Sequence, residues 1–380
     1  MSKKHYRDLF DRIIDEENIY RAYRKALKGD GKYHIEAMEF MLDEVYNLQE
    51  LRKSLIDGTY EFSGYIRFTV YEPKERIVDA PHFKDKIVQL AINNILKEIY
   101  NKSFIYDSYA CIDDKGTHKC AKRIQHLMRK AKWEYGEETT IIKGDFKKFF
   151  YSICRDTLKQ ALLKKISCQR TLELLFLIID SADIIDLLGL PLGNTLSQLF
   201  ANVYLNEFDN YCKRVLSLKY YARYMDDFII VVKNKEIAKE TIGLITEYVE
   251  STLGLRLNEN KTKHFPINQG VNTIGYKIYT THMLLRNESK KKIKRKIRAM
   301  PGLILEGKMT IEKAEQILNS WKGHAEHGDS YNFIQSLLDR FDFLYLKKKG
   351  DKTVLKIDKS KLKKDGGGVD ILEEGQVAFV

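Results

Sequence analysis

The chain has 380 residues, 44% of them hydrophobic, which is enough for two or three packed subdomains around a buried core. Lys and Arg outnumber Asp and Glu by 65 to 53, and this basic excess indicates a polyanionic partner, although charge alone does not separate nucleic acid from a membrane surface. The five cysteines have no CxxC spacing, and neither a signal sequence nor a membrane-spanning run is found, so we expect a cytoplasmic protein in a reducing compartment.

The first third of the chain is predicted to be helical with one β-hairpin. Apolar residues recur at helical spacing through residues 6–57. Period-two alternation around Pro73 then predicts a hairpin that pairs Arg67–Tyr71 with Arg76–Asp79. Two further helices are expected next, over residues 84–100 and 117–132.

The central part of the chain alternates strands with helices. The stretch "TTIIKGD" at 139–145 predicts a strand that runs into a turn, and "YYARYMDDFIIVV" at 220–232 predicts a strand, a turn and a second strand. The other expected elements are helices at 196–216 and 235–253, a strand at 254–258, a hairpin at 272–280, and lysine-rich helices to about residue 345. Strands interleaved with helices and followed by a helical region indicate an α+β enzyme with an all-α appendage.

Three aspartates lie where strands are expected to end. Asp145 closes the first strand, and Asp226 and Asp227 lie together at the tip of the strand–turn–strand pattern. Carboxylates brought to one place by distant strands are suitable ligands for Mg²⁺, and two such ions can activate a 3′-hydroxyl and stabilise a leaving pyrophosphate. Two adjacent like charges are costly unless a dication neutralises them. A single aspartate could equally be a turn residue, but the aromatic and β-branched flanks of "YMDD" make the pattern more specific.

This pattern and its neighbours resemble, in the same order, the motifs of reverse transcriptases. "YMDD" looks like their catalytic box and "KGDFKKFFYSI" like their first catalytic motif. The other resembling stretches are the fingers motifs "YEPKERIVDAPHFKDKIVQLAI" and "FIYDSYACIDDKGTHKCAKRIQ", the nucleotide-positioning motif "GLPLGNTLSQLFANVYLNEFD", the lysine-bearing motif "LGLRLNENKTKHF", the primer-grip hairpin "NTIGYKIY" and the thumb motif "SWKGHAEHGDSYNF". The resemblance extends over roughly residues 5 to 345.

The resemblance implies an α+β right-hand polymerase that makes DNA on an RNA template. The implied divisions are N-terminal helices and fingers (1–135), a palm with an antiparallel sheet (136–285), a helical thumb (286–346) and a tail that is first basic and then acidic and apolar (347–380). The implied cofactor is Mg²⁺, as two ions, with Mn²⁺ as a substitute. The implied partners are the RNA template, an RNA/DNA hybrid, deoxynucleotides, a structured non-coding RNA and a small accessory protein, with no membrane.

The resemblance also assigns roles to individual residues. Asp145 and Asp226 are expected to bind the metals, with Asp227 in support and Phe146 as a further ligand. Phe150 matches the aromatic residue that excludes a ribose 2′-hydroxyl. The residues expected around the incoming nucleotide are Lys74 and Arg76 at its triphosphate, with Phe146, Leu192, Gly193 and Gln198. Lys261 could protonate the departing pyrophosphate, although a surface lysine explains it nearly as well.

The subgroup is indicated by "LPLGNTLSQ". Most reverse transcriptases have glutamine where this chain has Leu192 and proline where it has Gln198, and the present version resembles the error-prone enzymes of diversity-generating retroelements. The alternative is an antiphage-defence or retron-like reverse transcriptase that uses its own non-coding RNA. A non-catalytic, maturase-like RNA-binding protein is a third possibility, which the three intact aspartates disfavour.

The C-terminal third of the chain supplies the basic surface. "KKKIKRKIR" at 290–298 places seven cations in nine positions, where the resemblance puts the primer–template duplex.

The three histidines His118, His324 and His327 are interpreted as structural or RNA-backbone contacts, and Trp321 and Tyr331 as parts of the thumb core. The tail could be an added strand, an RNA-binding arm or a segment that binds a partner.

Overall fold

The computed structural model describes residues 6–71, 75–181 and 188–362, and it divides into two compact units. The first unit comprises Met1–Gly116, Ile142–Ile230 and Glu236–Lys263, and the second Thr117–Ile141, Val231–Lys235 and His264–Val380. Each unit is therefore assembled from three separate segments of the chain. In the described ranges, no helix combines the length and the apolar character that crossing a bilayer requires.

The N-terminal part of the first unit is a group of helices around one buried helix. The helices are α1 (Leu9–Ile13), α2 (Glu16–Ala26), α3 (Ile35–Leu42), α4 (Glu44–Asp57) and α5 (Phe83–Tyr100). Helix α5 packs against α2, and its residues are apolar on most of its circumference, which is why it is buried. Asp15 caps α2 by accepting a hydrogen bond from the backbone N–H of Asn18. The helical prediction for residues 6–57 is confirmed.

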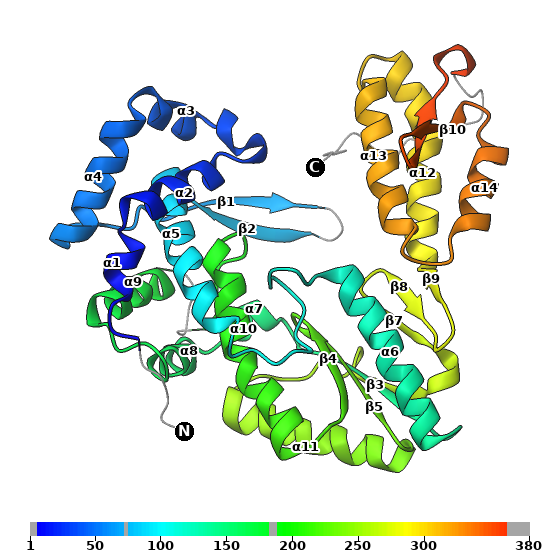
Figure 1. Cartoon of the computed structure of the whole chain (residues 1–380), viewed down its shortest axis with the longest axis horizontal. Helices are drawn as coiled ribbons and strands as arrows, with labels where there is room; N and C mark the ends of the chain where they lie inside the picture. Colours follow the sequence, from blue (N-terminus) through cyan, green and yellow to red (C-terminus); the bar gives the residue numbers. More distant parts are fainter. Residues whose placement is uncertain (1–5, 72–74, 182–187, 363–380) are drawn as a thin grey trace. The chain divides into compact units, whose positions relative to one another are not determined.

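The predicted hairpin is present and extends away from α5 (Figure 1). Strands β1 (Tyr65–Val70) and β2 (Arg76–Pro81) are antiparallel, and Arg67 lies opposite Asp79. The Arg67 guanidinium also contacts the Asp79 carboxylate at 2.7 Å. The backbone N–H of Asp79 donates to the carbonyl of Leu192 at 2.6 Å, so the hairpin is fastened to the loop that carries Leu192.

A four-stranded sheet carries the ends of the predicted catalytic strands. Its strand order is β4-β5-β3-β6, with bounds β3 (Thr140–Asp145), β4 (Tyr220–Tyr224), β5 (Asp227–Val232) and β6 (Lys263–Pro266). A Cβ atom on Gly144 would lie 2.0 Å from the Phe228 ring, so only glycine lets β3 and β5 pack this closely. The ring of Phe146 packs on those of Phe208 and Phe228, at 5.2 and 5.7 Å between centroids.

The chain segments between and after these strands form the remaining helices of the first unit. They are α7 (Phe149–Ser152), α8 (Arg155–Leu163), α9 (Gln169–Asp180), α10 (Thr195–Asn210), which continues as a π-helical turn (Tyr211–Val215), and α11 (Lys235–Leu253). The strand predicted at 254–258 is wrong, because only Leu257 makes a β-bridge, to Phe146. The chain runs beside the end of β3 for a few residues, where Asn258 N–H donates to the Asp145 carbonyl, and then turns away.

The second unit contains α6 (Thr117–Tyr135), a small antiparallel sheet and the C-terminal helices predicted to form the thumb. The sheet consists of β7 (Val271–Thr273), β8 (Tyr276–Ile278) and β9 (Met283–Leu285), and thus extends the predicted hairpin by one strand. Three histidines gather where α6, β8 and α13 meet. The His118 and His327 rings stack at 3.7 Å, and the Tyr276 hydroxyl lies within hydrogen-bonding distance of Nδ1 of His118 and of His324.

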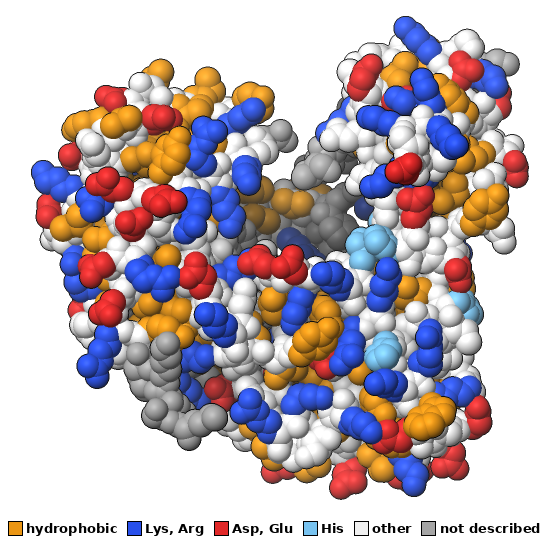
Figure 2. Space-filling view, in the orientation of Figure 1, with side chains coloured by type: hydrophobic (Ala, Val, Ile, Leu, Met, Phe, Trp, Pro, Cys, Tyr) orange, Lys and Arg blue, Asp and Glu red, His pale blue; other side chains and the backbone are white. Residues whose placement is uncertain are grey.

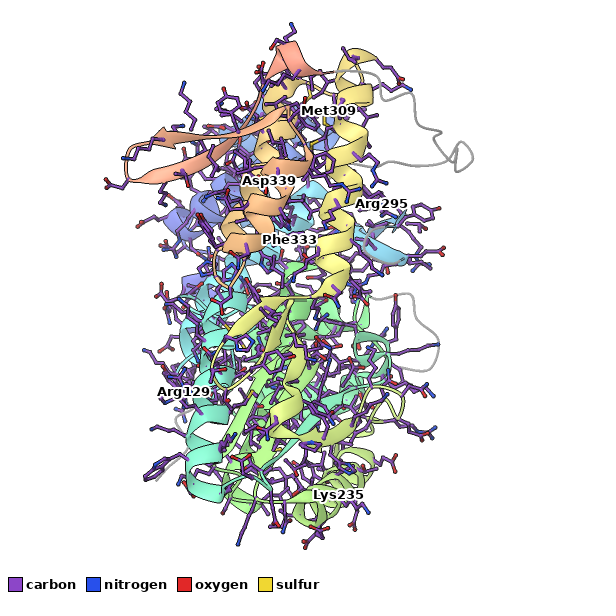
Figure 3. The ribbon with its side chains drawn as sticks, turned by 90° about the vertical axis from the view of Figure 1, so that its right-hand side faces the viewer. Arg129, Lys235, Arg295, Met309, Phe333 and Asp339 are labelled. Carbon is purple, nitrogen blue, oxygen red and sulfur yellow. The ribbon has the colours of Figure 1, made fainter. Side chains whose placement is uncertain are left out.

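The region predicted to be the thumb contains α12 (Asn287–Leu305), α13 (Ile311–Ala325) and α14 (Tyr331–Arg340), with a hairpin of β10 (Leu344–Lys349) and β11 (Lys352–Ile357) (Figure 3). Leu355 and Ile357 of the hairpin are buried in the same core as Ile297 and Leu318. The first part of the predicted tail is therefore an added pair of strands. Trp321 packs against this core as expected, but Tyr331 is 73% exposed, so its assignment to the core is wrong.

Candidate active site

Asp145 is the last residue of β3, and its carboxylate is almost completely buried. The Lys261 ammonium donates to both of its oxygens, at 2.9 and 2.8 Å, and the Asn258 amide donates to Oδ1 at 3.1 Å. Asp145 is 4% exposed, whereas half of the Lys261 side chain remains accessible. Contact with this carboxylate raises the pKa of Lys261, so the amine stays protonated.

Asp226 and Asp227 lie at the turn between β4 and β5, as predicted. Met225, just before them, has a φ of 54°, a left-handed backbone conformation that few non-glycine residues adopt. Burial raises the pKa of Asp226, and repulsion from Asp145 adds to the rise. Burial, together with repulsion from Asp226 and Asp145, raises the pKa of Asp227 to about 6. The fold thus brings the three predicted carboxylates into one electrostatic environment.

These carboxylates provide hard oxygen donors of the kind that Mg²⁺ prefers. Their crowding is costly when all are ionised, and a dication would relieve that cost, so the donor set is chemically suited to Mg²⁺. These side chains do not form a complete metal site by themselves. Within the described ranges, no group of three or more His, Cys, Asp or Glu is arranged to bind a metal. The Phe146 ring is buried in the aromatic cluster, so only its backbone could serve as a ligand.

Arg223, which was not among the predicted site residues, supports the turn that carries Asp226 and Asp227. It is fully buried, and its guanidinium forms a bidentate pair with Asp209 of α10 at 2.7 Å for both contacts. The same guanidinium donates to the Met225 carbonyl at 2.9 Å. It also contacts the Ser108 hydroxyl and the Asn202 side-chain oxygen, at 3.0 and 3.2 Å. A charged residue within the apolar strand "YYARY" was the signal that could have indicated this network.

The residues predicted around the nucleotide lie on several elements of the first unit. Arg76 opens β2, and its charge lowers the pKa of Asp226 against the larger effect of burial. Lys74 falls outside the described residues. Phe150 is half-buried in α7, its ring 5.4 Å from that of Phe149. Its carbonyl accepts from the Leu190 N–H at 2.8 Å, which ties α7 to the loop before α10.

That loop contains the residues that suggested the subgroup. Leu192 is half-buried, and Gln198 is exposed on the first turn of α10. Gly193 has a φ of 107°, and a Cβ atom there would lie 2.6 Å from Cγ1 of Val78, so glycine is required for the loop to approach β2. Asn194 caps α10 by accepting from the Leu196 N–H at 2.7 Å.

A basic groove of about 430 Å³ runs between α12 and α13 of the second unit. Lys292, Lys296 and Lys313 line it together with Trp321, whose buried Nε1 has no hydrogen-bond partner in the described chain. Arg295, also on α12, is exposed and points away from the helix bundle (Figure 3). Lys and Arg side chains cover much of the face of the molecule seen in Figure 2, as the net charge predicts.

Comparison with known proteins identifies the class. Residues 72–278, more than half of the chain, match the family described as reverse transcriptase (RNA-dependent DNA polymerase). The chain therefore belongs to the reverse transcriptase family, and the expected α+β polymerase fold is confirmed. The expectation of an RNA-directed DNA polymerase is confirmed at the level of this family.

Individual relatives agree with that assignment. Protein YkfC of Escherichia coli is 29% identical over 285 residues, which cover 64% of this chain and 72% of YkfC. The group II intron-encoded protein LtrA of Lactococcus lactis is 26% identical over 56% of this chain, but only 35% of LtrA is covered. Among solved structures, telomerase of Candida tropicalis in complex with a fragment of telomeric RNA aligns with a TM-score of 0.48 and 13% identity, over 78% of this chain and 59% of that one. A likeness at that level adds nothing to the family assignment.

Proposed function

We propose that this chain synthesises DNA on an RNA template at the site formed by Asp145, Asp226 and Asp227. The observation that carries the proposal is the convergence of these three carboxylates, the buried one of Asp145 at the end of β3 and the partly buried ones of Asp226 and Asp227 at the turn between β4 and β5, in a chain of the reverse transcriptase family. Extension of a DNA primer on an RNA template, followed with each deoxynucleotide and Mg²⁺, tests it. Within this proposal the fingers, palm and thumb divisions at 1–135, 136–285 and 286–346 remain predictions.

The chain's own residues have separable tasks in this reaction. Asp145, Asp226 and Asp227, with the Phe146 backbone, would bind two Mg²⁺ ions, which when bound lower the pKa of the primer hydroxyl and stabilise negative charge on the leaving pyrophosphate. Arg76 would contact the triphosphate as a bidentate donor, together with Lys74. Lys261 is protonated beside Asp145 and could give its proton to the departing pyrophosphate once it leaves that carboxylate.

The groove between α12 and α13 supports the proposed binding of a primer–template duplex. Lys292, Lys296 and Lys313 provide positive charge that can pair with phosphates. An A-form duplex in this groove would be recognised through its backbone and shape rather than its base edges. A structured non-coding RNA and a small accessory protein remain proposed partners of the whole assembly.

Phe150 should select the sugar of the incoming nucleotide. Replacing it with alanine removes a half-buried ring near the end of β3 and opens space for a 2′-hydroxyl. We expect the preference for deoxy- over ribonucleotides to fall by roughly ten- to hundredfold, the range that loss of one steric or apolar contact allows. The measurement is kcat/KM for dGTP and GTP on one primer–template. Phe149→Leu, in the neighbouring core position, is the control for a general loosening of α7, and an unchanged ratio in Phe150→Ala would place the gate elsewhere.

We further propose that the enzyme belongs to the diversity-generating subgroup, on the strength of Leu192 and Gln198. The Leu192 side chain can pack against the incoming nucleotide but cannot donate a hydrogen bond to it. A correctly paired nucleotide therefore gains no hydrogen bond here that a mispaired one would lack, and the two differ less in binding free energy. Leu192→Gln should restore a donor and lower misincorporation opposite template adenine by a factor of several up to ~100, as a recovered contact of about 1–3 kcal/mol allows.

Sequencing of DNA copied from one RNA by the wild type, by Leu192→Gln and by the double variant with Gln198→Pro checks this prediction. Leu190→Gln is not a suitable control, because Leu190 is buried, so exposed Leu188→Gln serves instead. If the wild type already copies adenine as accurately as the other bases, the subgroup proposal is wrong, and the defence or retron-like alternative takes its place.

A further inference from the structure

A second basic pocket lies in the first unit, between α2 and α5. Its volume is about 470 Å³, and the cations that line it are Arg21, Lys25, Lys28 and Lys97. Two of these, Arg21 and Lys25, are at positions i and i+4 of α2 and therefore lie on one face of that helix, and Lys28 lies in the extended segment just after it. The fourth comes from α5, on the other side of the pocket.

The acidic residues of the pocket neutralise only part of this charge. Glu98 pairs with Arg12, and Asp113 pairs with Lys97. Within the described ranges, Lys25 and Lys28 have no carboxylate within ion-pairing distance, and Arg21 donates only to the side-chain oxygen of Asn18, at 3.2 Å. Within the described residues, the pocket therefore contains three cations that form no direct ion pair with a carboxylate.

These cations also repel one another. Partial burial lowers the pKa of Lys25, and the charges of Lys97, Lys28 and Arg21 lower it further, against an opposing effect of Asp113. Like charges that line one pocket lower the free energy of unfolding, and a bound anion would relieve this repulsion. Two amides, those of Asn94 and Asn101, line the same pocket and can hydrogen-bond to sugar or phosphate oxygens.

We infer that this pocket binds the phosphodiester backbone of a single RNA strand, separately from the polymerase site. Arg21 and Lys25 are about 6 Å apart along α2, Lys28 lies beyond the end of that helix, and Lys97 comes from α5. Cations distributed in this way favour a chain of phosphates over a single phosphate group. A concave pocket also suits an entering strand better than a flat lipid surface. The inference rests on the proposed function only in that RNA is the polyanion.

The test is RNA binding by a variant in which Arg21, Lys25 and Lys28 are all replaced by methionine, which keeps the aliphatic stems and removes the charges. The probe is fluorescent oligouridylate without a primer, and the readout is its dissociation constant as a function of salt. We expect affinity at low salt to fall about ten- to hundredfold, and the slope of log K against log [salt] to decrease by about 2, since each single-stranded phosphate contact contributes about 0.7.

The matched control is replacement of Lys233, Lys235 and Lys239 by methionine, which removes the same charge from exposed positions around the start of α11. Equal slopes in the two triple variants would overturn the inference, because the contribution would then be net charge alone. Displacement of the RNA by tripolyphosphate, but not by inorganic phosphate at equal ionic strength, would reassign the pocket to a small polyphosphate. Binding to phosphatidylserine vesicles that only the pocket variant loses would reassign it to a membrane.

Primer extension on a short hybrid distinguishes this inference from the proposed function. Extension should be the same in the wild type and both triple variants, because no substituted residue touches the catalytic carboxylates. Absence of extension in the wild type itself would contradict the polymerase proposal. The salt dependence of oligouridylate binding in the two triple variants would still decide whether the pocket binds RNA. A thermal unfolding curve for each variant confirms that the helices remain folded.

Discussion

Asp226→Asn should lower nucleotide incorporation at least about a thousandfold while the protein remains folded. Asparagine keeps the shape of the side chain but removes the negative charge that a metal ligand supplies, and a thousandfold loss corresponds to about 4 kcal/mol of transition-state stabilisation. Asp145→Asn should have a similar effect on rate. The measurement is the rate of single-nucleotide addition to a primer annealed to RNA.

Stability separates this loss of chemistry from a loss of fold. Burial raises the pKa of Asp226, which means that the charged carboxylate is less stable in the folded protein than in the unfolded chain. Removing the charge should therefore leave the free energy of unfolding equal or slightly higher. Asp156→Asn, at an exposed position of α8, is the control and should be fully active. Residual incorporation above about one-thousandth of the wild-type rate in Asp226→Asn would count against the two-metal assignment.

Arg223→Met should destabilise the protein by about 3–5 kcal/mol, because it leaves the Asp209 carboxylate buried without its partner. The double variant with Asp209→Leu removes both charges and should recover much of that stability. The recovery should be incomplete, since the Tyr221 hydroxyl, which donates to Asp209, would also lose its acceptor. Urea unfolding of the single and double variants is the measurement.

Activity should not recover with stability in the double variant. Arg223 donates to the Met225 carbonyl and so supports the left-handed turn that presents Asp226 and Asp227. Without that donor the turn is less well defined, and we expect kcat to fall while KM for the nucleotide changes little. Arg223→Lys, which keeps the charge but not the fork, should lie between wild type and Arg223→Met. A stable double variant with wild-type kcat would show that Arg223 has only a structural role.

The periodicity of apolar residues correctly predicted the helices and strands whose conformation depends on the local sequence pattern. The hairpin register with Arg67 opposite Asp79, helix α11 at 235–253, and the aspartates at a strand–turn–strand tip were all expected from the sequence. Each depends on alternation or helical spacing within a few residues, which is the information that a single sequence contains. The strand expected at 254–258 had the right composition but pairs through one bridge only, because its partner strand ends there.

Contacts between distant segments could not be predicted in the same way. Arg223 is visibly a charge in an apolar strand, but its partner Asp209 lies on a helix whose orientation no local pattern fixes. Lys261 was expected to act on the pyrophosphate, which stays a prediction, and its ion pair with Asp145 is a contact that only the fold reveals. Tyr331 was assigned to the core because it is aromatic within a thumb motif, yet it opens α14 and faces solvent.

The interleaved segments of the second unit have a consequence for biosynthesis. Helix α6 packs on β8, and the Tyr276 hydroxyl contacts His118, 158 positions earlier in the chain. At a synthesis rate of roughly 5–20 residues per second, α6 leaves the ribosome about 8 to 30 seconds before that strand is made. During this interval the apolar residues of α6 that are buried in the folded protein, among them Ile124, Leu127 and Met128, are present without the strand on which the helix packs. The nascent chain is therefore exposed to chaperones and to other nascent chains during this period, and slow translation between α6 and β8 lengthens it.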